Sequence, residues 1–303
     1  MKLIKEIRAN IYLYILALPG IFFLIIFAYV PLSGHILAFI DFKYSTGFLH
    51  SKFVGFDNFK FFFGGGDWLV VTKNTLFLNT LFLGIGLSFA LFIAVFIGEM
   101  RNAAIKKVSQ SFIFLPYFIS WQVISLMIYS LLNSSTGLVN QAYIALGLKP
   151  VGWYSRPELW PGILTFFNIF KYAGYNSIVF LAALSGITEE LYESARIDGA
   201  TRFQQLLYVT LPLLRPIFLI MLLMGVGRIF YGDFGMIYGI VADNGVLFPT
   251  TDVIDTYSYR VLRQVGNLSM SSAVVLYQSV MGVVTIVFFN WVVRRIDPDV
   301  RLF

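Results

Sequence analysis

The chain contains no cysteine, only two histidines and few charged residues among its 303 positions. Without cysteine it can form no disulfide and perform no thiol chemistry. His35 and His50 stand outside any metal-binding pattern such as HExxH, and no GxxxxGK[ST] phosphate-binding loop occurs. These absences exclude common arrangements of a metalloenzyme or of a chain that itself hydrolyses ATP. We therefore expect no catalytic residue, no metal site and no cofactor bound by this chain.

Charge is scarce because apolar residues dominate the composition. Hydrophobic residues make up 58% of the chain and charged residues 13%, whereas soluble domains carry about 25% charged residues. The net charge of +6 comes from basic residues scattered along the chain. A scattered excess does not predict nucleic-acid binding and is better explained by the Lys and Arg bias of membrane-protein loops. The composition indicates a protein embedded in membrane lipid.

Six apolar stretches are long enough to cross a bilayer as helices, at about 1.5 Å of rise per residue. They predict an all-α, polytopic membrane protein with its transmembrane domain over 11–294, between the termini 1–10 and 295–303. Pro31 is expected to close the first span, because proline interrupts helical hydrogen bonding. The predicted spans are about 11–31, 75–98, 111–132, 159–184, 215–240 and 270–293.

The segments between these spans differ in charge. The N-terminus, the loops 99–107 and 189–215 and the C-terminal end from Arg294 carry twelve Lys and Arg in short segments, whereas the opposite loops carry eight over longer segments. Short loops rich in Lys and Arg remain in the cytoplasm. We therefore predict that both termini and the loop 189–212 are cytoplasmic.

The loop 189–212 is the most charge-dense part of the chain and lies between two apolar spans. Each charge at the centre of a bilayer costs about 2.5–3.5 kcal/mol, so this loop must lie at the membrane surface. Its pattern predicts a helix over 189–198, a bend at Gly199, and a second helix capped by Thr201 and ended before Pro212. Periodicity alone favours an amphipathic connector lying on the membrane.

The spacing within this loop resembles the EAA loop of ABC importer permeases. That loop runs Glu-Ala-Ala, three residues, Gly, nine residues, an aliphatic residue, one residue, Leu-Pro. The matching residues are Glu193, Ala195, Gly199, Val209, Leu211 and Pro212. Ser194 departs from the alanine that is usual at the second position. The triplet Asp198-Gly199-Ala200 is similar to that of the carbohydrate-uptake branch, especially permeases for complex oligosaccharides.

The resemblance implies a permease subunit with type I ABC importer architecture in a bacterial cytoplasmic membrane. It also implies a second homologous permease, ATP-binding subunits that use ATP and Mg, and an extracellular solute-binding protein that delivers a sugar. The helix pair of the loop would couple this chain to an ATPase. The coupling residues implied are Glu193, Ala195, Arg196, Asp198, Gly199, Ala200, Leu211 and Pro212.

Other functions fit a polytopic membrane protein too. The alternatives are an ABC permease for a non-sugar solute, or a passive channel or secondary carrier. Carriers often show internal repeats, and we find none between 1–150 and 151–303. The sequence therefore favours the importer over the carrier.

Polar residues at membrane depth are the candidates for a substrate pathway. On the fourth span, one helical face presents two amide or ammonium groups and two phenols. The residues are Asn168, Lys171, Tyr172 and Tyr175, with Asn176 beside them. Because polar groups are costly in lipid, that face should point into the bundle or a water-filled path. It is either a surface for sugar hydroxyls and ring faces or a buried network between helices.

The fifth span carries a second candidate group, Arg228, Tyr231 and Asp233, in a glycine-rich region. Either the helix is broken there, as in many transport sites, or the glycines permit close packing against a neighbouring span. We slightly favour close packing. Gln278, a single polar residue in the sixth span, is expected to make an interhelical hydrogen bond. Four tryptophans near span ends are expected to form an interfacial belt: Trp121, Trp153, Trp160 and Trp291.

Overall fold

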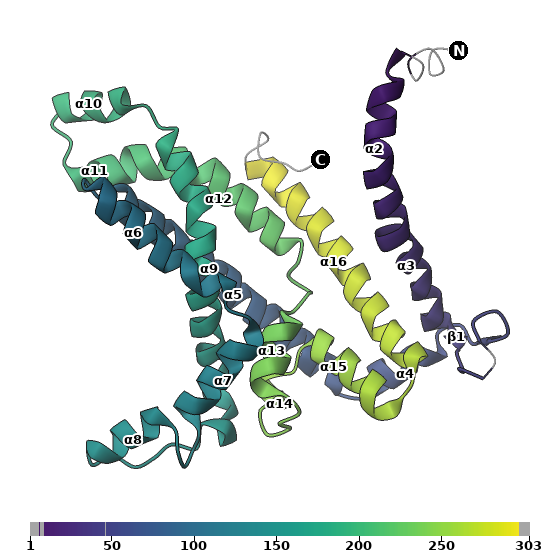
Figure 1. Ribbon diagram of the computed structural model, residues 1–303. Coiled ribbons are helices and arrows are strands. Elements are labelled where there is room, and N and C mark those ends of the chain that lie inside the picture. Colours follow the sequence, from purple (N-terminus) through teal and green to yellow (C-terminus); the bar gives the residue numbers. More distant parts are fainter. Residues whose placement is uncertain (1–5, 7–8, 46, 297–303) are drawn as a thin grey trace. The chain divides into compact units, whose positions relative to one another are not determined.

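The computed structural model describes residues 6, 9–45 and 47–296. Its regular secondary structure is helical apart from one two-stranded sheet in the described residues, which confirms the predicted all-α class (Figure 1). The chain divides into two compact units, Met1–Gly65 with Ser258–Tyr277, and Gly66–Tyr257 with Gln278–Phe303. Most of the two predicted cytoplasmic termini, 1–10 and 295–303, lies outside the described residues.

The first unit begins with a long helical stretch that does not end at Pro31. Helix α2 (Ile11–Leu24) continues through the π-helix η1 (Ile25–Tyr29) and α3 (Val30–Leu32) into the 3₁₀-helix η2 (Ser33–Phe39). In the π-turn the Val30 N–H bonds to the carbonyl of Ile25. This widened turn comes just before Pro31, so the missing N–H of proline falls where the helix restarts. The predicted end at Pro31 is wrong for this reason.

A short polar segment follows in the same unit. Strands β1 (Ile40–Asp41) and β2 (Lys52–Phe53) pair antiparallel and precede α4 (Asp57–Gly64). The Asn58 side chain donates to the carbonyls of Ala38 and Ile40, both at 3.0 Å. These bonds fix α4 against the end of η2. The unit also contains η7 (Val261–Val265) and the first part of α16 (Leu268–Ile296).

The second unit holds most of the transmembrane helices. Its centre is a long contact between α5 (Asp67–Gly98) and α9 (Trp160–Ser185). The contact is close because Ala90 and Ala94 of α5 are fully buried against Phe180. Its other elements are α6 (Ala103–Phe114), η3 (Leu115–Phe118), α7 (Trp121–Leu132), α8 (Leu138–Ala145), η4 (Trp153–Ser155), η5 (Pro157–Leu159), α10 (Glu189–Ile197), α11 (Arg202–Gln205), η6 (Leu206–Thr210), α12 (Leu211–Val226), α13 (Phe234–Val241), α14 (Phe248–Thr251), part of α15 (Ile254–Arg260) and α16 from Gln278 onward.

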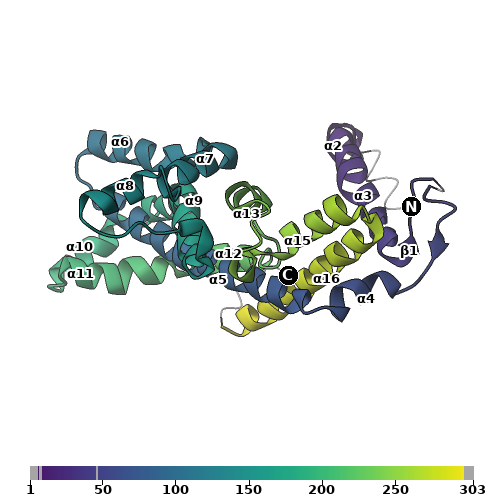
Figure 2. The same cartoon turned by 90° about the horizontal axis from the view of Figure 1, so that it is seen from below.

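A second hydrophobic core joins α7 and α13, which lie side by side in both views (Figures 1 and 2). Ile124 and Ile128 of α7 and Met236 and Ile237 of α13 are at most 1% exposed. Trp160, at the start of α9, is fully buried in the same core and donates its indole N–H to the Trp153 carbonyl. Because Trp160 lies in a core, its assignment to an interfacial belt is wrong.

The third predicted span, 111–132, is not one straight helix. Residues Ala103–Phe118 and Trp121–Leu132 meet at an angle of 94°. Pro116 lies in the last turn before the bend, and Ile119 is extended. Ser120 then starts α7, since its hydroxyl accepts the N–H of Val123. A broken span or a re-entrant segment replaces the predicted straight one.

The fifth predicted span, 215–240, differs at its start and is interrupted in its second half. Helix runs without a gap over Arg202–Val226, is interrupted over 227–233, and resumes as α13. The predicted helix end before Pro212 is wrong, because the Leu211 N–H bonds to the carbonyl of Leu206 in the π-helix η6. The widened turn again comes just before a proline.

The remaining helix boundaries shift less. Judged by helix length and hydropathy, fewer than the six predicted membrane spans are found among the described residues. Helix α5 begins at Asp67 rather than Thr75, and acidic residues are favourable in a first turn. Four described helices are long and apolar enough to span a bilayer, or up to five if the bent pair is one span. Helix α9 covers the predicted 159–184 but is not among them. The six-span layout stays a prediction.

Candidate transport cavity and coupling helices

The interruption over 227–233 is held in place by side chains from other helices. The Asn79 amide on α5 donates to the carbonyls of Ile229 at 2.7 Å and Tyr231 at 3.2 Å. A helix break leaves backbone carbonyls without helical partners, which is costly inside a membrane. Asn79 supplies donors to two of them, so the break is a defined structure.

Helix α16 supports the same break. The Gln278 amide donates to the Phe230 carbonyl at 2.7 Å and to an Asp255 carboxylate oxygen at 2.9 Å. That oxygen also accepts the Gly232 N–H at 2.6 Å. Burial raises the pKa of the Asp255 carboxyl group, and these two hydrogen bonds oppose the rise. The interhelical hydrogen bond predicted for Gln278 is confirmed.

Asp233 ends the break and starts α13. One carboxylate oxygen accepts the Met236 N–H at 3.0 Å, as an N-cap does. The other accepts the Trp121 indole N–H at 2.7 Å and the Tyr172 hydroxyl at 2.9 Å. Trp121 therefore contacts the candidate site rather than a membrane interface, which makes the belt prediction wrong for it as well.

A cavity of about 510 Å³ lies beside this break. It brings together six of the eight residues predicted for the substrate pathway, three from α9 and three from the non-helical segment 227–233. They are Asn168, Tyr172, Asn176, Arg228, Tyr231 and Asp233. Phe82 and Asn79 of α5 also line it. Both alternatives for the fifth span hold in part: the helix is broken, and an added Cβ at Gly225 would overlap the Leu83 side chain on the neighbouring helix α5.

Lys171 and Tyr175 do not line this cavity. The Lys171 ammonium, on a residue 7% exposed, donates to the carbonyls of Tyr117, at 2.9 Å, and Ile119. It also lies 5.4 Å from the centre of the Trp121 ring. Tyr175 stacks on Tyr117 with 4.3 Å between ring centres. These two side chains support the bend between η3 and α7.

Replacing Lys171 with methionine is expected to destabilise the permease, because the two carbonyls lose their donor at a buried position. A buried acceptor left without a partner costs about 1–3 kcal/mol. The melting temperature of the detergent-extracted protein should fall. Lys107→Met, which removes the same charge from an exposed position on α6, is the control. Equal melting temperatures for the two variants would contradict the stabilising role of the hydrogen bonds that Lys171 donates to these carbonyls.

The loop 189–212 forms two helices around a bend, as predicted. Helix α10 ends at Ile197, and Gly199 has a φ of +76°, a region that favours glycine. Thr201 and Gln204 then form a reciprocal capping box at the start of α11. Of the predicted coupling residues, Leu211 and Pro212 lie in the first turn of α12 instead. The others lie on α10 and the bend: Glu193, Ala195, Arg196, Asp198, Gly199 and Ala200.

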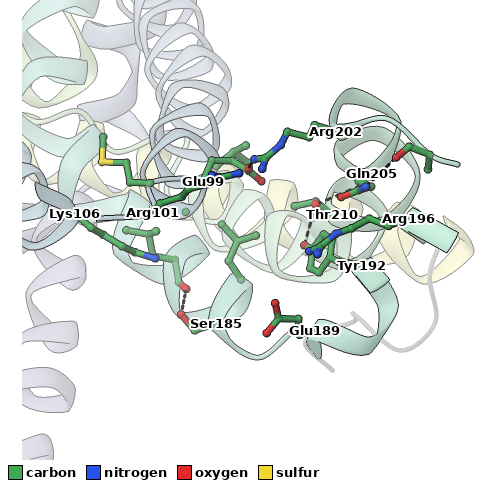
Figure 3. A pocket seen from close by; sticks show the side chains of 16 residues that line it. Glu99, Arg101, Lys106, Ser185, Glu189, Tyr192, Arg196, Arg202, Gln205 and Thr210 are labelled. Atoms are coloured by element: carbon green, nitrogen blue, oxygen red, sulfur yellow. Dashed lines mark hydrogen bonds and ion pairs between the residues drawn. The ribbon is translucent and has the colours of Figure 1, made fainter. Parts of the chain in front are cut away.

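A second cavity, of about 660 Å³, separates these helices from the end of α5 and the start of α6 (Figure 3). Across it Arg202 forms an ion pair with Glu99 at 2.9 Å. The hydroxyls of Tyr192 and Thr210 are 3.0 Å apart, which joins α10 to the end of η6. Sequence reasoning missed these contacts, and no local signal could have found the Arg202–Glu99 pair, because 103 positions separate the two residues.

Comparison with known proteins identifies the class. The family described as binding-protein-dependent transport system inner membrane component matches residues 86–302. LplB of Bacillus subtilis (strain 168) is 32% identical over 293 residues, covering 97% of this chain and 92% of LplB. The polygalacturonan/rhamnogalacturonan transport system permease YteP of the same organism is 30% identical over 297 residues, covering 98% and 92%.

A solved structure shows the same likeness. A chain in the crystal structure of a bacterial alginate ABC transporter, in complex with an alginate pentasaccharide-bound periplasmic protein, matches with a TM-score of 0.87. It is 34% identical, and the match covers 98% of each chain. The present chain belongs to the family of binding-protein-dependent transport system inner membrane components.

This membership confirms the resemblance found in the EAA-type loop. The chain is a membrane-embedded permease subunit of an ABC importer that works with a solute-binding protein. It is not an enzyme, because the relatives are permease subunits and ATP hydrolysis belongs to a separate subunit. A passive channel and a secondary carrier are thereby set aside.

Proposed function

We propose that this permease imports an oligosaccharide or a related sugar by alternating access, with the cavity beside the 227–233 break on its path. The cavity carries the proposal: amides, phenols and a guanidinium from α9 and from the interrupted segment meet there. Sugar hydroxyls pair with such groups, and interrupted helices at membrane depth are typical of transport sites. The transport systems named for YteP and for the solved structure handle carbohydrate polymers.

The remaining parts of the importer are partners. A second homologous permease would complete the path, and two ATP-binding subunits would use ATP and Mg, with no cofactor held by this chain. An extracellular solute-binding protein would deliver the sugar. Both termini would lie in the cytoplasm, as the loop charges predict.

Coupling to the ATPase would occur at α10 and α11. Ile197 is 86% exposed and Phe203 is 67% exposed on these helices, beside the exposed charges of Glu193 and Arg196. Large apolar side chains among charges at an exposed surface are typical of a protein interface. The Tyr192–Thr210 and Arg202–Glu99 contacts would transmit movement of the pair to α12 and α5.

Co-purification followed by ATPase measurement tests this proposal. A tagged chain, extracted gently from its native membrane, should carry an ATP-binding subunit and a second permease in fixed ratio. Oligosaccharide together with the binding protein should stimulate ATP hydrolysis by that complex. Absence of an ATP-binding subunit under still milder extraction, or stimulation by non-carbohydrate solutes alone, would overturn the proposal.

A further inference from the structure

We propose that Arg228 makes this importer select sugars that carry carboxylate groups. The inference rests on the proposed function and deepens it, because it names the chemical class of sugar that the cavity takes. Within the part of the chain that the structure describes, Arg228 and Asp233 are the two charged residues that line the cavity. Their surroundings differ, and that difference decides the charge presented to a solute.

The carboxylate oxygens of Asp233 are occupied by hydrogen bonds within the protein. Its two oxygens accept three hydrogen bonds, from the Met236 N–H, the Trp121 indole and the Tyr172 hydroxyl. Asp233 is therefore a structural cap whose carboxylate oxygens already accept three hydrogen bonds from protein groups.

The guanidinium of Arg228 makes no such hydrogen bonds to described residues. The backbone is fixed, since the Arg228 N–H bonds to the Gly225 carbonyl at 3.0 Å and its own carbonyl accepts the Tyr231 N–H at 2.8 Å. The side chain is exposed at the cavity, and no described residue forms an ion pair or hydrogen bond with the guanidinium. All five N–H donors of the guanidinium therefore remain available, on a side chain whose backbone is held in one position.

An arginine at membrane depth without a partner is costly unless it serves a solute or a water-filled path. Its planar fork matches a carboxylate through two parallel hydrogen bonds, which a neutral hydroxyl cannot reproduce. Asn176 offers a neighbouring amide for sugar hydroxyls. The cavity therefore presents a guanidinium without a described partner beside neutral polar groups, while the Asp233 oxygens are already hydrogen-bonded, an arrangement that suits a uronic-acid sugar.

The test compares charged and neutral forms of one sugar. The whole transporter, with its binding protein, is reconstituted in vesicles and offered oligogalacturonate or alginate oligosaccharides, and the same oligosaccharides after carboxyl reduction. Uptake of each form gives an acidic-to-neutral ratio. Because the binding protein is the same in every sample, a change of ratio between variants reports on the permease.

Arg228→Gln is expected to lower the ratio by at least about tenfold, the size of one lost charge-assisted hydrogen-bond pair. Arg228→Lys, which keeps the charge but not the fork, should fall between Gln and the native protein. Arg215→Gln removes an arginine from the exposed surface of α12 outside this cavity and should leave the ratio unchanged. Co-purification of each variant with its partners shows that it is folded.

Two results would overturn the inference and leave the proposed function standing. One is preferred uptake of the carboxyl-reduced sugars by the native transporter. The other is an acidic-to-neutral ratio that Arg228→Gln does not change. Uptake of non-carbohydrate solutes alone would overturn the proposed function, and this inference with it.

Discussion

The substitution Gly174→Ala is expected to lower sharply the amount of folded permease in the membrane. Gly174 lies in α9 where α6 crosses it. An added Cβ would overlap the carbonyl oxygen of Ile113 and lie 2.6 Å from its carbonyl carbon. Backbone atoms cannot rotate away as a side chain can, so the two helices would have to separate. Overpacking usually costs about 1–3 kcal/mol, and we expect the upper end or more here.

Gly162→Ala on the same helix is the matched control, because no atom lies within 4 Å of its added Cβ. Alanine is also a better helix former than glycine, so this variant should accumulate at least as well as the native chain. The measurement is the amount and melting temperature of tagged monodisperse protein after mild extraction. Native yield and melting temperature for Gly174→Ala would show that α6 and α9 do not pack this closely.

Proline at position 199 is expected to separate ATP hydrolysis from uptake while the chain still inserts into the membrane. Gly199 has a φ of +76° and donates its N–H to the Arg196 carbonyl at 3.0 Å. Proline fixes φ near −65° and has no N–H, so the bend between α10 and α11 cannot form. A backbone change of this kind costs about 1–3 kcal/mol, and uptake should fall roughly tenfold or more while ATPase activity persists.

The variant Gly199→Asn distinguishes a requirement for the left-handed backbone conformation from a requirement for a position without a side chain. No atom lies within 4 Å of an added Cβ at Gly199, so only the dihedral angle constrains this position. Asparagine tolerates the left-handed region better than most residues, and Gly199→Asn should keep most of the uptake. Coupled transport in Gly199→Pro would count against the coupling role. Equal loss in both variants would indicate that the side chain, and not the bend, is at fault.

The sequence by itself determined the membrane class, the helical fold, the family and the local structure of the coupling loop. These depend on features that lie close together along the chain. Apolar windows decide which segments enter lipid, and Thr201 and Gln204 form their capping box within three positions. Gly199 supplies the left-handed bend by its own lack of a Cβ. Local chemistry suffices for such features.

Only the tertiary structure decided how the interrupted helices are supported and which polar residues meet. Hydropathy showed that Pro31 and Pro212 stand in or beside apolar spans, but π-turns before them let the helices continue. The carbonyls freed at 227–233 find a donor in Asn79, about 150 positions earlier. Lys171 shares a helical face with Tyr172, yet it supports the bend while Tyr172 lines the cavity. A buried polar group must be paired, and its partner is set by the packing of distant helices.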